Sequence, residues 1–169
     1  MSKDSHLRPA PGWGRQAGHT RVQRLAAEAQ AGAAIDRLLI AERIYRYGWS
    51  YDERDQQGLE DCFSEDGSWE GLIMGRDRVG PFTGRTDIVQ WLMGFWPQQS
   101  DQRRHIFTNV VIDDLGAATA TAHAYLMLTA SANATVSTET VGPYRLQLAK
   151  EPDGVWRFTH LLGGYDVPF

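Results

Sequence analysis

The longest regular pattern in the chain is a set of apolar residues that recur at three- and four-residue steps. Its members are Ile35, Leu38, Leu39, Ile44, Tyr47 and Tyr51. Such spacing places side chains on one face of an α-helix, so we expect a long helix that buries this face and ends near Asp52. Good helix formers over residues 21–34 predict a separate short helix before it, which Gly32 weakens.

After Asp52 the pattern changes several times. A short helix, GLEDCF, is expected before the turn SEDGS, and the strand SWEGLIM follows. Glycines over residues 72–84 predict a loop, and a compact helix from about Thr86 to Trp96 then ends at Pro97. The remaining chain is typical of four strands joined by turns, over residues 104–113, 118–128, 140–150 and 155–167.

This order of elements predicts an α+β fold, with N-terminal helices packed on a strongly bent mixed or antiparallel sheet. The 169 residues correspond to one domain, large enough for a core and an internal pocket. We divide the chain into a mobile N-terminal arm with a short helix, residues 1–32, and a single α+β domain, residues 33–169. Trp13 in the arm is expected to dock on a neighbour.

Composition and charge exclude several classes of protein. The 42% of hydrophobic residues is globular, and a net charge of −4 argues against nucleic-acid binding. No apolar run approaches the ~20 residues of a membrane span, and the start has no apolar signal segment, so we expect a cytoplasmic protein. Cys62 is the single cysteine, and dinucleotide, P-loop and zinc-protease motifs are absent, so we expect no metal and no cofactor.

Two ionisable residues stand out in apolar surroundings. Asp52 ends the long helix, one residue after the inward-facing Tyr51, and faces the negative end of the helix dipole. This position disfavours the ionised carboxylate and suits a proton acceptor. His105 shares a strand face with Phe107 and Asn109, where an imidazole either forms a structural hydrogen bond or transfers a proton. A solvated helix-end aspartate and a structural histidine are the alternatives.

Residues 118–128 alternate alanines with larger side chains. The alanines, at positions 118, 120, 122 and 124, predict a tight outer surface against a helix or another subunit, and we expect a homodimer or homotrimer. The opposite face carries His123 and Tyr125, a mixture typical of a pocket wall. His123 is therefore the third candidate for the site.

The segments IAERIYRYGWSYDERD, CFSEDGSWEG, TGRTDI, RRHIFTNVVID and DGVWRFTHL, in this order, resemble the SnoaL-like family. That family belongs to the nuclear-transport-factor-2-like superfamily of cone-shaped α+β barrels, and the likeness covers residues 33–166. Within the superfamily the chain is similar to scytalone dehydratase, in which a Tyr-Asp pair ends the first helix and two histidines lie on strands. The matching residues are Tyr51, Asp52, His105 and His123.

The resemblance implies a cofactor-independent lyase or isomerase that acts on a small hydrophobic cyclic substrate, such as a polyketide, aromatic or steroid. Asp52 would orient His105 as a general base, and His123 or Tyr51 would bond the developing oxyanion. Trp69 lies near the place of a second tyrosine in the dehydratase, and Arg145 near that of an asparagine. The residues expected to bind substrate are Tyr47, Trp69, Phe107, Asn109, Tyr125, Tyr144 and Arg145.

Two other classes of function remain open at this point. A non-catalytic binding or assembly module, and the small subunit of a ring-hydroxylating dioxygenase, use the same cone, and fold does not determine function. We also expect the loop of residues 72–84 or the C-terminal tail to cover the mouth of the pocket.

Overall fold

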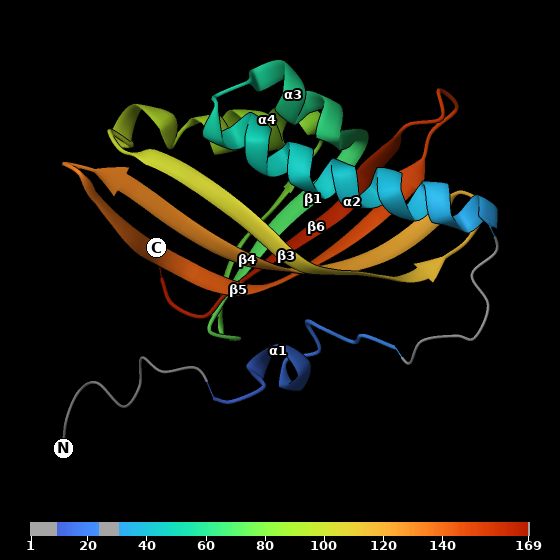
Figure 1. The fold of residues 1–169 in the computed structure, drawn as a ribbon, viewed down its shortest axis with the longest axis horizontal. Helices are drawn as coiled ribbons and strands as arrows, with labels where there is room; N and C mark the ends of the chain where they lie inside the picture. The colour runs from blue at the N-terminus through green and yellow to red at the C-terminus, as the bar shows by residue number, and fades with distance from the viewer. Residues whose placement is uncertain (1–9, 24–30, 169) are drawn as a thin grey trace.

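The computed structural model describes residues 10–23 and 31–168. In this part of the chain, short connections join helices and long strands (Figure 1). The helices are α1 (Trp13–Gln16), α2 (Ala31–Asp52), α3 (Gln56–Cys62), α4 (Arg85–Met93) and the 3₁₀ helix η2 (Trp96–Gln98). The strands are β1 (Phe63–Ile73), β2 (Asp77–Thr83), β3 (Gln102–Leu115), β4 (Thr119–Ala132), β5 (Thr135–Lys150) and β6 (Trp156–Tyr165).

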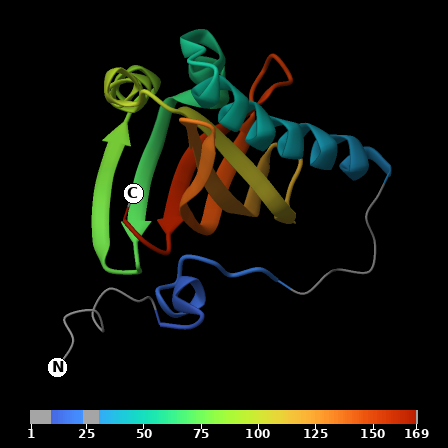
Figure 2. The same cartoon turned by 60° about the vertical axis from the view of Figure 1, so that its left-hand side comes forward.

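The six strands form one mixed sheet in the order β2-β1-β6-β5-β4-β3. β1 and β6 are parallel, and the other neighbouring strands are antiparallel. The sheet is strongly curved; α2, α3 and α4 cover its concave face, and α1 lies beyond the convex face (Figures 1 and 2). The predicted α+β fold, with N-terminal helices on a bent mixed sheet, is confirmed.

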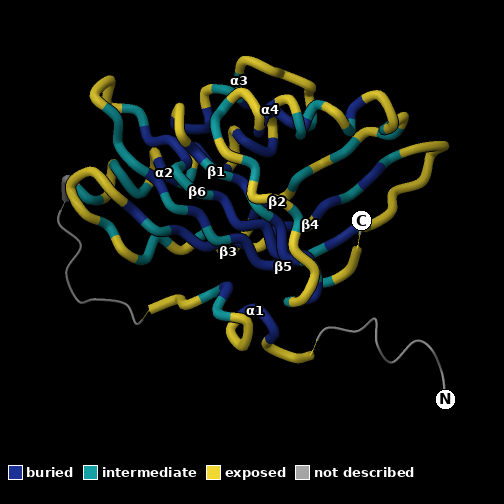
Figure 3. The backbone as a smooth tube through the Cα atoms, turned by 180° about the vertical axis from the view of Figure 1, so that it is seen from behind, coloured by how far each residue is buried: buried dark blue, intermediate teal, exposed yellow. Residues whose placement is uncertain are grey.

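The core lies between the concave face and helix α2. Ile40, Ile44, Tyr47 and Tyr51 of α2 are buried, and the middle of the sheet is buried beneath them (Figure 3). Ile35, Leu38 and Leu39 were expected on the same face, but they are 63%, 72% and 42% exposed. The inward face instead begins at Asp36, whose carboxylate accepts hydrogen bonds from Lys150 and Trp156, both at 2.9 Å.

Several other elements differ in detail from the expectation. Residues 72–84 form a hairpin of β1 and β2 rather than a loop, and the expected turn SEDGS lies within β1. The polar residues 131–138 extend β4 and β5, which meet at Asn133 and Ala134, both with positive φ. Of the short helix predicted over residues 21–34, residues 24–30 lie outside the described residues, and residues 31–34 belong to α2.

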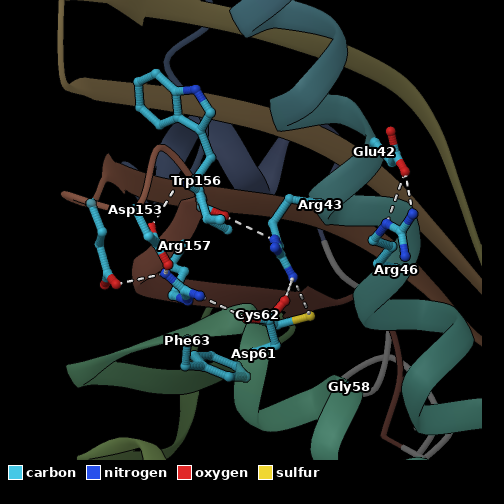
Figure 4. A network of polar contacts seen from close by, with 12 residues as sticks. Glu42, Arg43, Arg46, Gly58, Asp61, Cys62, Phe63, Asp153, Trp156 and Arg157 are labelled. Atoms are coloured by element: carbon cyan, nitrogen blue, oxygen red, sulfur yellow. Dashed lines mark hydrogen bonds and ion pairs between the residues drawn. The ribbon is translucent and has the colours of Figure 1, made fainter.

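A network of arginines and carboxylates joins α2, α3 and β6 (Figure 4). Arg43 donates to the Trp156 carbonyl at 2.8 Å and to Asp61 at 3.0 Å, and Arg157 donates to Asp61 at 2.7 Å. Cys62 is fully buried beside Arg43, and burial raises the pKa of its thiol to about 11, which makes it unreactive. The network fixes α2 relative to the sheet.

The first described residues pack on the convex face of the sheet. The Trp13 indole donates to the Asp166 carboxylate at 2.5 Å, so the neighbour on which it docks is its own chain. His19 is also buried there and bonds the Pro143 carbonyl at 2.8 Å. Within residues 10–23 and 31–168, no helix combines the length and apolar character of a membrane span.

Candidate active site

Asp52 and His105 are in direct contact where the end of α2 meets β3. Asp52 Oδ1 lies 2.6 Å from His105 Nδ1, and Asp52 Oδ2 accepts the backbone N–H of His105 at 2.8 Å. The two side chains are only 5% and 9% exposed. Because a carboxylate only accepts hydrogen bonds, this contact places a proton on Nδ1 and leaves the lone pair on Nε2.

The approach of α2 to β3 depends on a glycine one turn before Asp52. A Cβ atom at Gly48 would meet the His105 carbonyl oxygen at 3.0 Å, His105 Cβ at 3.2 Å and Phe107 Cε2 at 3.3 Å. Any larger residue would therefore press directly against the strand that carries the histidine. Gly48 lets the helix lie close enough for a short carboxylate to reach the imidazole.

His105 faces a cavity of about 250 Å³ between α2, the sheet and the segment that joins α4 to β3. This volume is just below the usual range of ligand pockets, so it suits a ligand of one or two rings. The walls are mainly aromatic, with two glutamines and one arginine. The lining residues are Tyr47, Tyr51, Trp69, Trp91, Leu92, Phe95, Gln98, Gln99, Arg103, His105, Leu128, Tyr144 and Tyr165.

Tyr51, which directly precedes Asp52 in the chain, places a hydroxyl group in the cavity beside the Asp52–His105 pair. Its ring lies edge-on to the imidazole, with 4.8 Å between ring centroids, and its hydroxyl is 3.1 Å from the Gln99 amide nitrogen. Burial raises the pKa of Tyr51, so its hydroxyl stays protonated and remains a donor.

Other tyrosine hydroxyls line the cavity in hydrogen-bonded pairs. Tyr144 and Tyr165 are 2.7 Å apart, and Tyr47 accepts from the Trp69 indole at 3.3 Å. Burial is the main cause that raises the pKa of Tyr47, Tyr144 and Tyr165. The cavity thus contains neutral hydroxyl groups among aromatic walls, and Tyr47, Trp69 and Tyr144 lie where the sequence placed them.

His123 does not face this cavity, which corrects the prediction from the sequence. Ala120, Ala122 and Ala124 of β4 are buried on the concave side, and the intervening residues point to the convex side. There His123 Nε2 is 3.6 Å from an Asp113 carboxylate oxygen. These three alanines therefore belong to the core and not to a surface for another subunit, whereas Ala118, which was expected beside them, precedes β4 and is exposed.

Tyr125 and Arg145 also lie on the convex side of the sheet, outside the pocket. Tyr125 is 55% exposed, and Arg145 is paired with His123 across β4 and β5 on the convex side. In β3 the register shifts between Thr108 and Val111, and Asn109 has a left-handed φ of 52°. This bulge leaves Asn109 exposed, outside the cavity.

Phe107 is buried behind the pocket wall rather than lining the cavity. The centroid of its ring is 5.3 Å from that of Tyr144 and 6.2 Å from that of Tyr47. It therefore supports two tyrosines that do line the cavity.

Sequence reasoning missed the residues that close the cavity. Gln98, Gln99 and Arg103 follow α4, and Trp91 and Phe95 belong to α4 and its end. The segment from α4 to β3 therefore forms the rim, and none of residues 72–84 lines the cavity. Tyr165 of β6 is a buried wall residue, so a covering role of the C-terminal tail stays a prediction. The available signal was strand parity, because Arg103 lies two residues before His105 on the same face.

In the described part of the chain, no three His, Cys, Asp or Glu side chains gather closely enough to hold a metal ion. The carboxylate of Asp52 is engaged by His105 through both oxygens. The chemistry available at the site is therefore that of one histidine, one aspartate, several tyrosine hydroxyls and one arginine.

A curved sheet with helices on its concave face and an aromatic pocket between them defines the class of small α+β barrel proteins with an internal site. The model of the SnoaL-like domain matches residues 32–161, and the chain belongs to that family. A comparison with curated proteins found no match.

Solved structures with the same fold have been determined from several bacteria. A protein from Catenulispora acidiphila in complex with S-DNPA is 26% identical, with a TM-score of 0.68 over 79% of this chain and 95% of that chain. An aspartate-to-asparagine variant of Rv3472, a protein of unknown function from Mycobacterium tuberculosis, is 23% identical, with a TM-score of 0.67 over 79% and 77%. A candidate β subunit of an aromatic-ring-hydroxylating dioxygenase from Novosphingobium aromaticivorans is 15% identical, with a TM-score of 0.68 over 82% and 94%.

Proposed function

We propose that the protein is a cofactor-independent lyase or isomerase that removes a proton from a small hydrophobic cyclic substrate. The observation that carries this proposal is the contact of 2.6 Å between Asp52 Oδ1 and His105 Nδ1 beside an aromatic cavity. A buried carboxylate that orients an imidazole is the arrangement of a general base.

His105 is the base in this proposal. Asp52 holds the proton on Nδ1, and Nε2 makes no hydrogen bond with the described residues, so its lone pair remains for a substrate C–H or O–H. When the imidazole takes that proton it becomes a cation, which the adjacent carboxylate stabilises. Proton transfer by a positioned side chain is typically worth about 10²–10⁴-fold in rate.

Tyr51 is the donor to the oxygen on which negative charge develops. Its hydroxyl is protonated, lies beside the imidazole and is held by Gln99 at the cavity wall. In an elimination, His105 would take the proton next to a carbonyl, and the C–O bond of the adjacent hydroxyl group would break as the double bond forms. Tyr51 would hydrogen-bond the carbonyl or departing oxygen, and the departing hydroxyl would leave as water with the proton returned by His105. In an isomerisation, the same proton would return at another carbon.

The proposal is tested by a screen for elimination or isomerisation of cyclic hydroxy-carbonyl compounds, followed by mass spectrometry. We expect turnover by the native protein, and its loss in His105→Ala, with ligand affinity retained within a few-fold. His160→Ala is the matched control, because His160 bonds Glu70 away from the cavity. Conversion by neither the native protein nor any variant, with ligand binding intact, would instead support a binding or assembly module.

We also propose that the protein forms a homodimer or homotrimer. Three of the four alanines that first suggested this, Ala120, Ala122 and Ala124, are buried in the core, so that reason no longer holds. Support comes instead from large apolar side chains exposed on α2 and on the convex face of the sheet, which a second copy would cover. They include Leu38 (72% exposed), Trp49 (66%), Tyr125 (55%) and Met127 (45%).

A further inference from the structure

We propose that the substrate carries a carboxylate and that Arg103 binds it at the rim of the cavity. This inference rests on the proposed function, in that it takes the cavity beside His105 as the substrate site. Arg103 is the one arginine or lysine among the residues that line the cavity, and sequence reasoning gave it no role.

The strand geometry directs Arg103 and His105 to the same cavity. The two residues are separated by one position on β3, and their cross-strand partners, Ala130 and Leu128, are both buried. Successive side chains of a strand alternate between faces, so residues 103 and 105 share the concave side. A ligand that reaches the imidazole therefore also lies near the guanidinium.

Asp101 holds the guanidinium by one edge. Arg103 Nε donates to Asp101 Oδ1 at 2.6 Å, and a terminal nitrogen of Arg103 donates to Asp101 Oδ2 at 3.2 Å. The Arg103 side chain is 18% exposed. Because a guanidinium has five N–H donors, this pairing uses two and leaves three in a fixed plane. A planar acceptor with two oxygens, such as a carboxylate, matches that remaining edge.

A second arginine adds positive charge to the rim. Arg54 follows the end of α2 in the left-handed conformation, with φ of 56°, and donates to the Gln99 carbonyl at 2.6 Å. No carboxylate lies within ion-pair distance of Arg54 in the described part of the chain. Arg54 thereby offsets the negative charge of Asp52, which is unpaired when His105 is neutral, so the open edge of Arg103 remains the group that favours an anionic ligand.

The aromatic walls and the arginine together define the class of ligand. Trp69 and Trp91 form one wall, with ring centroids 4.3 Å apart, and they suit a flat one- or two-ring compound. The inferred substrate is thus an aromatic or partly reduced cyclic carboxylic acid, with its acid group at Arg103 and its reacting carbon at His105.

The test compares two ligands of the same shape, 2-naphthoate and its neutral amide, 2-naphthamide. Binding is measured at pH 7.5 by quenching of tryptophan fluorescence and by calorimetry. We expect native protein to bind the carboxylate about tenfold more tightly than the amide, because a charge-assisted pair replaces a neutral one. Arg103→Gln should abolish this preference, and Arg103→Lys should retain part of it.

Arg104→Gln is the matched control. This substitution removes the same charge one position further along β3, but the Arg104 side chain faces outward and donates to Glu53 at 3.0 Å. The preference for the carboxylate should survive in this variant. Equal affinity of the native protein for the two ligands, or a preference that survives Arg103→Gln, would overturn the inference. So would binding of neither ligand by native protein at about 1 mM.

The native comparison needs no variant, so the inference remains testable if Arg103→Gln does not fold. It is also separable from the proposed function, because it measures binding without turnover. A carboxylate preference without any conversion would overturn the catalytic proposal alone. Conversion of neutral substrates without a carboxylate preference would overturn the Arg103 inference alone.

Discussion

Replacement of Asp52 by asparagine should reverse the protonation of His105 without changing the shape of the site. Asp52 accepts two hydrogen bonds from the same residue, one from the backbone N–H and one from Nδ1. Asparagine offers one acceptor and one donor. The backbone N–H cannot become an acceptor, so the asparagine oxygen must face it, and the asparagine NH₂ must face Nδ1.

An NH₂ group that donates to Nδ1 requires the imidazole to carry its proton on Nε2. That nitrogen then points a proton into the cavity and can no longer act as a base. A wrong tautomer of this kind lowers turnover by about 10⁴-fold, which corresponds to ~5.4 kcal/mol of transition-state stabilisation. The loss of one charge-assisted hydrogen bond costs the fold only about 1–3 kcal/mol.

The assay has two parts, of which one needs no substrate. Two-dimensional ¹⁵N NMR of the imidazole distinguishes the tautomers, and we expect the proton on Nδ1 in the native protein and on Nε2 in Asp52→Asn. Turnover should fall in parallel, while the far-ultraviolet circular dichroism stays native. An unchanged tautomer, or turnover within tenfold of native, would refute this reasoning.

Two further predictions concern the helix contact and the arm. Gly48→Ala should lower turnover and weaken the His105–Asp52 hydrogen bond, seen as an upfield shift of the Nδ1 proton, because the new Cβ would meet His105 at 3.0–3.2 Å; an unchanged shift contradicts this. Burial lowers the pKa of His19 to about 4 from 6.5. The contribution of neutral His19 to the free energy of unfolding is therefore complete above pH 6.5 and falls by about 3 kcal/mol as the pH drops toward 4. Denaturation midpoints of native protein and His19→Gln measure it, and an equal pH dependence of both would rule out His19 as the cause.

The part of the site that could be predicted from the sequence is the part set by helix periodicity. The repeat that contains Ile44, Tyr47 and Tyr51 fixed both the inward face of α2 and the end of the helix, and so the position of Asp52. Strand parity likewise grouped His105 with Phe107 on one face of an apolar strand, without showing which face lies inward. Both rest on local geometry, which a single sequence expresses directly.

The faces of β3 and β4 could not be obtained in the same way. Alternation in β4 shows that Ala122 and His123 point to opposite sides, but it does not show which side α2 covers. The pattern favoured the larger side chains as the pocket wall, whereas in the structure the buried concave side carries the small ones. In β3, nothing in the sequence indicates the bulge at Asn109, which reverses the faces of residues 110–112 until a second register shift, between Ile112 and Asp114, restores them.

The hydrogen bond from the His105 backbone N–H to Asp52 couples the edge of the sheet to the integrity of the site. β3 is a terminal strand of the sheet, and its N-terminal half is held to α2 at this point by the same carboxylate that orients the imidazole. A fluctuation that separates β3 from α2 therefore also breaks the Asp52–His105 pair. Whenever the pair is intact, the backbone amide of His105 is protected from exchange with solvent. The fraction of molecules competent for chemistry is consequently tied to the local opening equilibrium of one strand, and the exchange rate of a single amide proton reports it.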